Sequence, residues 1–204
     1  MQLVGVAGTG TDVGKTWVTA AVARALRSDG VSVAARKPAQ SFGPDDVLDA
    51  VVLGAATDET PEVVCRPDRW YEVPMAPPMA ASALGRPSFT VADLARELRW
   101  PDGLEVGFVE TAGGVRSPIA ADGDCAALLR AVAPDIVLLI ADAGLGTINA
   151  VRLSLDALSG LRTLVVLNRY DGRDSLHRAN RAWLTERDGN QVATSIEELA
   201  TALQ

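Results

Sequence analysis

Residues 8–16 read Gly-Thr-Gly-Thr-Asp-Val-Gly-Lys-Thr, and they constrain the fold of this chain more than any other stretch. An apolar run at residues 3–7 precedes them, and a helical pattern begins at Trp17. A strand, a glycine-rich turn and a helix after Gly-Lys-Thr form the arrangement that encloses nucleotide phosphates, because backbone N–H groups close around the anion and the helix N-terminus adds a favourable dipole. The stretch therefore predicts that Lys15 reaches the terminal phosphates and that the Thr16 hydroxyl ligates Mg²⁺.

The spacing within this stretch is wider than usual. The common pattern has four residues between its first glycine and Gly-Lys-Ser/Thr, whereas five residues separate Gly8 from Gly14 here. The alternative interpretation is an ordinary strand-to-helix turn. We favour the phosphate loop because Gly-Lys-Thr stands where a strand passes into a helix, which is the context that supports such a motif.

Lysine is rare in this chain. Of 19 basic residues, only Lys15 and Lys37 are lysines, and the other 17 are arginines. A lysine ammonium is a compact point charge, whereas the arginine guanidinium is planar and more weakly hydrated. Lys37 is therefore a second candidate for the site, the alternative being a surface lysine with no special role.

The overall composition indicates one globular domain of 204 residues with a sizeable core. Its apolar runs are too short to span a bilayer, and the first lacks the basic segment of a signal peptide. The two cysteines, Cys65 and Cys125, form neither a disulfide framework nor a metal spacing, so we expect a reducing, cytoplasmic setting. A net charge of −7 argues against nucleic acid or an anionic membrane as the partner.

Strands and helices alternate along the chain. Helical patterns are expected at 17–29, from 45 onward, and at 79–84, 91–100, 124–133, 148–158, 176–186 and from 195; strands are expected at 3–7, 31–35, 104–109, 136–140, 163–167 and 191–193. The proline-rich residues 60–80 are expected to be an irregular surface loop. The alternation predicts an α/β fold: one P-loop NTPase-type domain, a three-layer sandwich of a mostly parallel sheet with helices on both faces.

Polar residues stand at the ends of several of these strands. Besides the glycine-rich turn, they are Lys37, Glu110, residues 142–147 and Asn168. In a parallel sheet the carboxyl ends of the strands lie at one edge, and ligands bind there. We therefore expect these residues to form one composite site.

In this order the motifs resemble those of the dethiobiotin synthetase family, from the first strand to Asn168. The matching parts are the stretched glycine-rich loop, Lys37-Pro38 with Ser41, an acidic helix with Asp49, Tyr71 with residues 74–77, and residues 109–114, 145–149 and 166–168. The resemblance implies an enzyme that makes dethiobiotin from 7,8-diaminopelargonate, CO₂ and ATP. One amine captures CO₂ as a carbamate, the carbamate takes the γ-phosphoryl group, and the second amine displaces phosphate from the mixed anhydride to close a cyclic urea.

The same resemblance implies a role for each matching residue. The nucleotide is held by Gly10, Thr11, Asp12, Val13, Gly14, Lys15 and Thr16, with Asn168 at the adenine edge. Lys37, Lys15 and Thr11 are the catalytic residues, and Ser41, Gly146, Thr147 and Asn149 bind substrate, the last three across a homodimer interface. Thr16, Asp49 and Glu110 hold Mg²⁺, with Asp46 as the alternative to Asp49.

The chain also departs from the family pattern. Gly10 and Asp12 stand where family members often carry Asp and Glu, and Thr111 replaces a glycine after Glu110. The region after Asn168 is short and has no clear match to the family's adenine-flanking segment, which leads to the hypothesis of loose base selection. The one histidine, His177, is expected to be exposed and without a role.

Three other functions are alternatives for this chain. A nucleotide-driven switch that positions septa or plasmids would carry a second lysine where Gly10 stands, and a membrane-seeking helix or a basic face. An amidoligase would need a nucleophilic cysteine, for which Cys65 and Cys125 have no suitable setting. A relative that has lost activity and survives as a dimeric nucleotide-binding protein is the third alternative.

Overall fold

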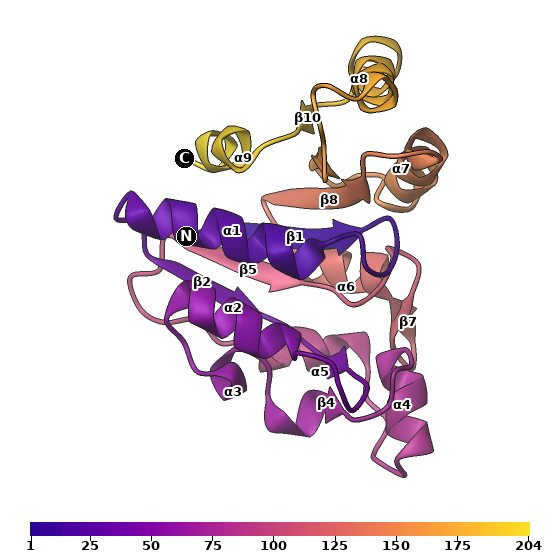
Figure 1. The fold of residues 1–204 in the computed structure, drawn as a ribbon. Coiled ribbons are helices and arrows are strands. Elements are labelled where there is room, and N and C mark those ends of the chain that lie inside the picture. Colours follow the sequence, from indigo (N-terminus) through magenta and orange to yellow (C-terminus); the bar gives the residue numbers. More distant parts are fainter.

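A six-stranded parallel sheet forms the centre of the computed structural model, which describes residues 1–204 (Figure 1). Its strand order is β10-β9-β8-β1-β5-β2. The strands are β1 (Gln2–Gly8), β2 (Val33–Arg36), β5 (Val106–Glu110), β8 (Ile136–Asp142), β9 (Thr163–Asn168) and β10 (Val192–Ala193). All five pairings are parallel, so the carboxyl ends of the strands open at the same edge.

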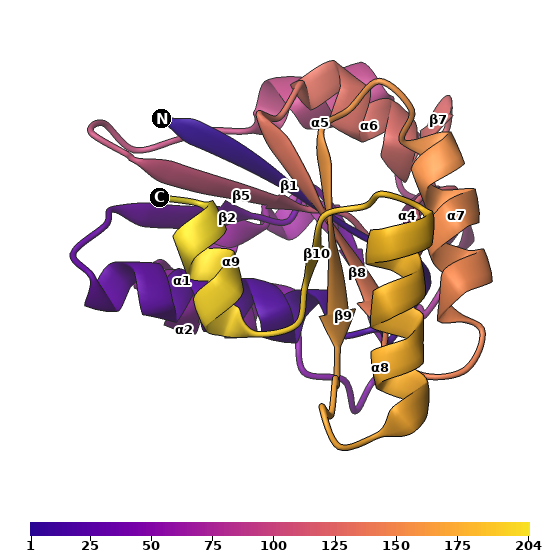
Figure 2. The same cartoon turned by 90° about the horizontal axis from the view of Figure 1, so that it is seen from above.

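Helices cover both faces of this sheet (Figure 2). One face carries α1 (Lys15–Ser28), α2 (Asp49–Thr57) and α9 (Ile196–Ala202); the other carries α6 (Cys125–Val132), α7 (Thr147–Ala157) and α8 (Ser175–Ala182) with the π-helical turn Trp183–Arg187. Successive side chains of a strand point to opposite faces. In β8, Leu138 therefore packs in the core with α1, and Leu139 packs in the core with α6 and α7. The predicted three-layer α/β fold is confirmed.

A third apolar cluster lies beside the sheet, under the connection between β2 and β5. The connection contains β3 (Gln40–Ser41), α3 (Pro61–Val64), the 3₁₀ turn Pro67–Arg69, β4 (Trp70–Tyr71), α4 (Pro77–Ala83) and α5 (Val91–Glu97), and β6 (Pro118–Ala120) and β7 (Gly123–Asp124) follow β5. Tyr71 and Phe89 stack within this cluster with ring centroids 5.9 Å apart. The expectation of an irregular loop at residues 60–80 is therefore wrong, because buried aromatic packing orders this proline-rich segment.

Two further expectations require correction. The acidic helix begins at Asp49, not at Asp45, because Asp46 accepts the Gly43 N–H in a turn and Leu48 is still extended. His177 is half-buried, not exposed, and its Nδ1 accepts the backbone N–H of Asp171 at 3.0 Å. The predicted short strand near residue 192 is confirmed. The predicted helix after Thr90 is also confirmed, and Thr90 and Asp93 form a capping box at its start. No helix combines the length and the apolar character needed to cross a membrane.

Candidate functional site

The loop between β1 and α1 wraps around the site where a phosphate group would bind. Gly14 has a φ of 92°, and a Cβ there would lie 2.1 Å from Nδ2 of Asn168, so only glycine fits. A Cβ on Gly8 would come within 2.9 Å of the Gly10 carbonyl. Lys15 begins α1, and its Nζ donates to the Gly10 carbonyl at 3.0 Å. The amine of Lys15 thus already lies in the concave side of its own loop.

Lys37 forms the centre of a buried ion cluster at the carboxyl ends of β2 and β5. Its Nζ lies 2.7 Å from Asp49 Oδ2 and 2.9 Å from Glu110 Oε1, and it donates to the Thr111 carbonyl at 3.1 Å. Lys37 is 2% exposed and Glu110 is fully buried. Burial alone would lower the pKa of Lys37, but Glu110 and Asp49 outweigh it and raise that pKa above its ordinary value. Lys37 therefore remains an ammonium ion at any physiological pH.

The charge of Lys37 also acts on Lys15. Burial, and next the nearby Lys37 charge, lower the pKa of Lys15 below its ordinary value. Burial would raise the pKa of Asp49, yet the Lys37 ammonium and its hydrogen bond bring it below the ordinary value. The ammonium of Lys15 thus lacks a counter-ion of its own, which suits a residue that receives an anionic ligand.

Three oxygen atoms from three elements converge next to this cluster. The Thr16 Oγ1 lies 2.8 Å from Asp49 Oδ1 and 2.7 Å from Glu110 Oε1. A hydroxyl has one proton and can donate it to only one of these carboxylates, so the set has an excess of oxygen lone pairs. Hard cations such as Mg²⁺ take oxygen ligands of this kind, usually one or two carboxylates together with phosphate and water. Two carboxylates with a hydroxyl are of this ligand type, and no group of three or more His, Cys, Asp or Glu side chains is placed to hold a metal ion.

A cleft of about 750 Å³ opens in front of these groups. Among its lining residues are Thr11, Asp12, Gly14, Lys15, Thr16, Lys37, Ser41, Asp46 and Asp49. Asp46 is exposed at the cleft and accepts the Gly43 N–H, whereas Asp49 lies against Thr16 and Lys37. The Ser41 hydroxyl donates to the Met75 carbonyl in the cleft wall.

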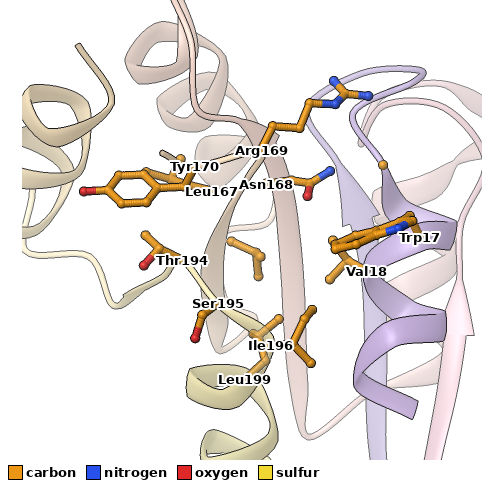
Figure 3. Close-up of a pocket in the computed structure, with 12 residues that line it drawn as sticks. Trp17, Val18, Leu167, Asn168, Arg169, Tyr170, Thr194, Ser195, Ile196 and Leu199 are labelled. Carbon is orange, nitrogen blue, oxygen red and sulfur yellow. The ribbon is translucent and has the colours of Figure 1, made fainter. Parts of the chain in front are cut away.

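A second cavity of about 510 Å³ lies between α1, β9 and the start of α9 (Figure 3). Its lining is mainly apolar and includes Trp17, Val18, Leu167, Tyr170, Ile196 and Leu199. Asn168, Thr194 and Ser195 supply side-chain polar groups, but Nδ2 of Asn168 already donates to the Val13 carbonyl at 2.9 Å. Gly14, Trp17 and Arg169 line both this cavity and the cleft, so the two are adjacent. We call them the base-side cavity and the phosphate-side cleft.

Not all of the expected site residues come together within one chain. Gly146, Thr147 and Asn149, at the start of α7, do not line the phosphate-side cleft. Gly146 and Asn149 are exposed, and the neighbouring Leu145 is 92% exposed. The Thr147 hydroxyl is buried without a hydrogen-bond partner.

One residue next to the site, Thr19, is not predicted from the sequence. The Thr19 hydroxyl, one turn after Lys15, lies 2.9 Å from the Lys15 carbonyl and 3.0 Å from Oε2 of Glu110. It has one proton to donate, and donation to Glu110 orients that carboxylate. The position of Thr19 on the same helix face as Thr16 is the only signal in the sequence.

Burial raises the pKa of Cys65 to about 12 and raises that of Cys125, in line with the prediction that neither cysteine is a nucleophile.

The fold and the loop together define a nucleotide-binding P-loop protein. The model of a family described as an AAA domain matches residues 2–202. The signal recognition particle receptor FtsY from Elizabethkingia anophelis superposes with a TM-score of 0.62 at 16% identity, over 99% of this chain and 63% of that one. The chain thus spans less than two thirds of that receptor structure, and the likeness is one of fold alone.

Sequence comparison narrows the class to a family. An ATP-dependent dethiobiotin synthetase from Rhodococcus jostii is 42% identical over 166 residues, covering 78% of this chain and 68% of that one. The synthetase from Streptomyces coelicolor is 37% identical over 213 residues, covering all of this chain and 87% of its own. The synthetase from Methylobacterium nodulans is 37% identical over 81% of this chain and 80% of its own. The chain belongs to the ATP-dependent dethiobiotin synthetase family.

Proposed function

We propose that this chain closes the cyclic urea of dethiobiotin from 7,8-diaminopelargonate, CO₂ and ATP, with release of ADP and phosphate. The observation that carries the proposal is the position of Lys37, which is buried at the phosphate-side cleft beside Lys15 and pairs with Asp49 and Glu110. A cleft that joins a phosphate loop to a second fixed ammonium suits the transfer of a phosphoryl group to an anionic acceptor. The relatives named above support this reaction over a switch or an inactive binding protein.

Lys37 is the residue that we assign to the reacting groups. The carbamate and the γ-phosphoryl group both carry negative charge, and they must approach each other for oxygen to attack phosphorus. An ammonium held in a site with little water reduces their repulsion and stabilises the charge that develops in transfer. Since two carboxylates keep Lys37 protonated, it acts as an electrostatic group and not as a base.

Lys15 and the loop are assigned to the triphosphate. In the structure, Lys15 Nζ donates to the Gly10 carbonyl, and a terminal phosphate oxygen offers the same ammonium a charged acceptor. The backbone N–H groups from Gly10 to Thr16 lie at the N-terminus of α1, where anions are favoured. Asn168 is assigned to the base through its carbonyl oxygen, because its amide nitrogen is engaged by Val13.

Thr16, Asp49 and Glu110 would hold Mg²⁺. When bound, the cation would neutralise phosphate charge and orient the γ-phosphoryl group. Lys37 shares both carboxylates, so one ammonium faces two carboxylates and the cluster keeps a net negative charge, which favours a bound cation. Thr11 and Ser41 line the same cleft and are assigned to the diamine and carbamate end.

A second copy of the chain is proposed to complete the diamine site. The start of α7 carries the buried, unpartnered Thr147 hydroxyl and lies outside the cleft of its own chain. A helix N-terminus favours a carboxylate, which the diamine carries at its far end. In a homodimer, Gly146, Thr147 and Asn149 of one chain would receive that carboxylate while the partner chain supplies the phosphate loop.

The proposal is tested by measuring phosphate release with the diamine, bicarbonate and Mg²⁺-ATP, each omitted in turn, with mass detection of the product. We expect phosphate and dethiobiotin in equal amounts, and neither without the diamine. Phosphate release that continues without the diamine would refute the assignment. Analytical ultracentrifugation tests the homodimer separately.

A further inference from the structure

Arg169 joins three parts of the site that are far apart in the sequence. It follows Asn168 at the carboxyl end of β9, and it lines both the base-side cavity and the phosphate-side cleft. One guanidinium nitrogen donates to Asp142 Oδ2 at 2.8 Å, and another donates to the Asp12 carbonyl at 2.8 Å. Figure 3 shows its side chain extending toward the loop that precedes α1, while Tyr170 points the other way.

The backbone of Arg169 is in an unfavourable conformation. Its φ is 57°, in the left-handed region that an arginine rarely adopts. Four non-glycine residues of the chain have a positive φ, and the hydrogen bond from Arg169 to Asp12 joins two of them, since Asp12 has a φ of 58°. Such strain persists where the surrounding structure holds it in place, and it is concentrated at functional sites.

Stability does not account for this arrangement. The ion pair between Arg169 and Asp142 is exposed, with 59% of the arginine side chain accessible, and exposed pairs contribute little to folding. The backbone strain opposes folding. The backbone conformation of Arg169 is unfavourable for folding, and its ion pair contributes almost nothing. The contribution of Arg169 therefore lies in the groups that its side chain positions.

We propose that Arg169 is a positioning residue that holds the tip of the phosphate loop, through the Asp12 carbonyl, in the conformation that receives the nucleotide. Asp142 orients the guanidinium and is itself held by the Gly144 N–H at 2.9 Å. The planar guanidinium can bind both acceptors at once, which a lysine ammonium on a flexible chain does less well. This inference rests on the proposed nucleotide site but not on the diamine reaction.

The test compares three variants of the full-length protein: Arg169→Gly, Arg169→Lys and the control Arg173→Gly. Glycine removes the backbone strain and the two side-chain hydrogen bonds to Asp142 and Asp12, which we call the clamp. Arg173 lies nearby and pairs with Asp171 at 3.2 Å, but it lines neither cavity. The dissociation constant of a non-hydrolysable ATP analogue is measured by calorimetry, and thermal unfolding and the exchange of the Asp12 and Val13 amide hydrogens are followed in parallel.

For Arg169→Gly we expect the dissociation constant to rise about tenfold, as for loss of a charge-assisted hydrogen bond, while the melting temperature stays the same or rises. Arg169→Lys should bind with intermediate affinity, Arg173→Gly should bind as wild type, and amide exchange at the loop tip should speed up only without the clamp. An unchanged affinity, or an affinity loss matched by a lower melting temperature, would overturn the proposal. Because binding is measured without the diamine, the result can be interpreted even if the chain does not make dethiobiotin.

Discussion

The phosphate-side cleft and the base-side cavity meet at Gly14, Trp17 and Arg169, yet they are built differently. The cleft holds its charges in one connected network, in which Lys37 and Glu110 are buried and paired. The cavity is largely apolar, and its few polar side chains are partly engaged elsewhere. A network fixes the position of each charge, whereas an apolar wall accepts any flat ring of suitable size. The contrast suggests an enzyme that is strict about phosphates and tolerant about bases.

The largest effect should come from breaking the network at its centre. Lys37→Ala should lower kcat about a thousandfold, near the upper end of the loss expected for removing one preorganised group at developing charge. Nucleotide binding should be nearly retained, because Lys15 and the loop remain. Single-turnover rates and calorimetric nucleotide titration check this result, with Lys37→Gln as a variant of closer size. Activity close to wild type in both variants would show that Lys37 does not act on the reacting groups.

A second test concerns the stability of the same network. Glu110→Gln keeps the shape but removes a buried charge that faces Lys37 and the hydroxyls of Thr16 and Thr19. Breaking a buried ion pair on one side typically costs about 3–5 kcal/mol in the free energy of unfolding. Urea denaturation measures the change, and Mg²⁺ titration of activity should show weaker saturation.

The matched control for that experiment is Asp58→Asn, which breaks the exposed pair between Arg27 and Asp58 at 3.5 Å. An exposed pair contributes about 0–1 kcal/mol, so its unfolding curve should hardly move. Equal losses in the two variants would mean that Glu110 is no more important to the fold than a surface acid.

The two regions also differed in how far the sequence could predict them. Strand-end placement was enough to expect Lys37, Glu110 and Thr16 at one site, because parallel strands bring their carboxyl ends together whatever the loops do. The contact between Lys37 and Asp49 does not follow from that topology, because Asp49 is the first residue of α2 and not a strand-end residue. The sequence predicts a start of the acidic helix at residue 45, because acidic residues are typical of a first helical turn. The turn at Asp46 moves that start to Asp49.

The rim of the base-side cavity could not be predicted in the same way. Nothing in the local pattern around residue 169 indicates a hydrogen bond to Asp12, since the two residues are 157 positions apart. Positive φ at an arginine is not signalled by residue type, since Asn, Asp and His are the non-glycine residues enriched there. Likewise, the short helices α3 and α4 depend on tertiary packing: α3 packs on the main core through Val64, and α4 packs in the cluster of Tyr71 and Phe89.

A moderate effect is expected at the base-side cavity. Trp17 is 61% exposed and borders both cavities, so it can stack on a base without selecting among bases. Trp17→Ala should weaken nucleotide binding about two- to tenfold, the usual value of an aromatic pair, and by similar factors for ATP, GTP and CTP. Wild-type kcat/KM values for these nucleotides should likewise agree within about tenfold. A strong preference for ATP would contradict the tolerant cavity and point to Asn168 as a selective reader.

The smallest effect is expected from the pair that links the two regions, Asp142 and Arg169. The hydrogen bond from Arg169 lowers the pKa of Asp142 below its ordinary value of 3.8. A lowered folded-state pKa means that the pair's contribution to stability is complete above the unfolded-state pKa and is lost as pH falls through the folded value. Asp142→Asn should therefore be less stable than wild type by under about 1 kcal/mol at pH 7, as for exposed pairs, and the difference should shrink below pH 4.

Urea denaturation at pH 7 and at pH 3 measures this difference, with Asp171→Asn as the control for an exposed pair nearby. The same Asp142→Asn protein should bind the ATP analogue several-fold more weakly than wild type at pH 7, because Arg169 loses the partner that orients it toward Asp12. A stability loss without an affinity loss would mean that the pair belongs to the fold alone. A loss in binding free energy that exceeds the loss in the free energy of unfolding would mean that one exposed arginine fixes the phosphate loop where the phosphate-side cleft and the base-side cavity meet.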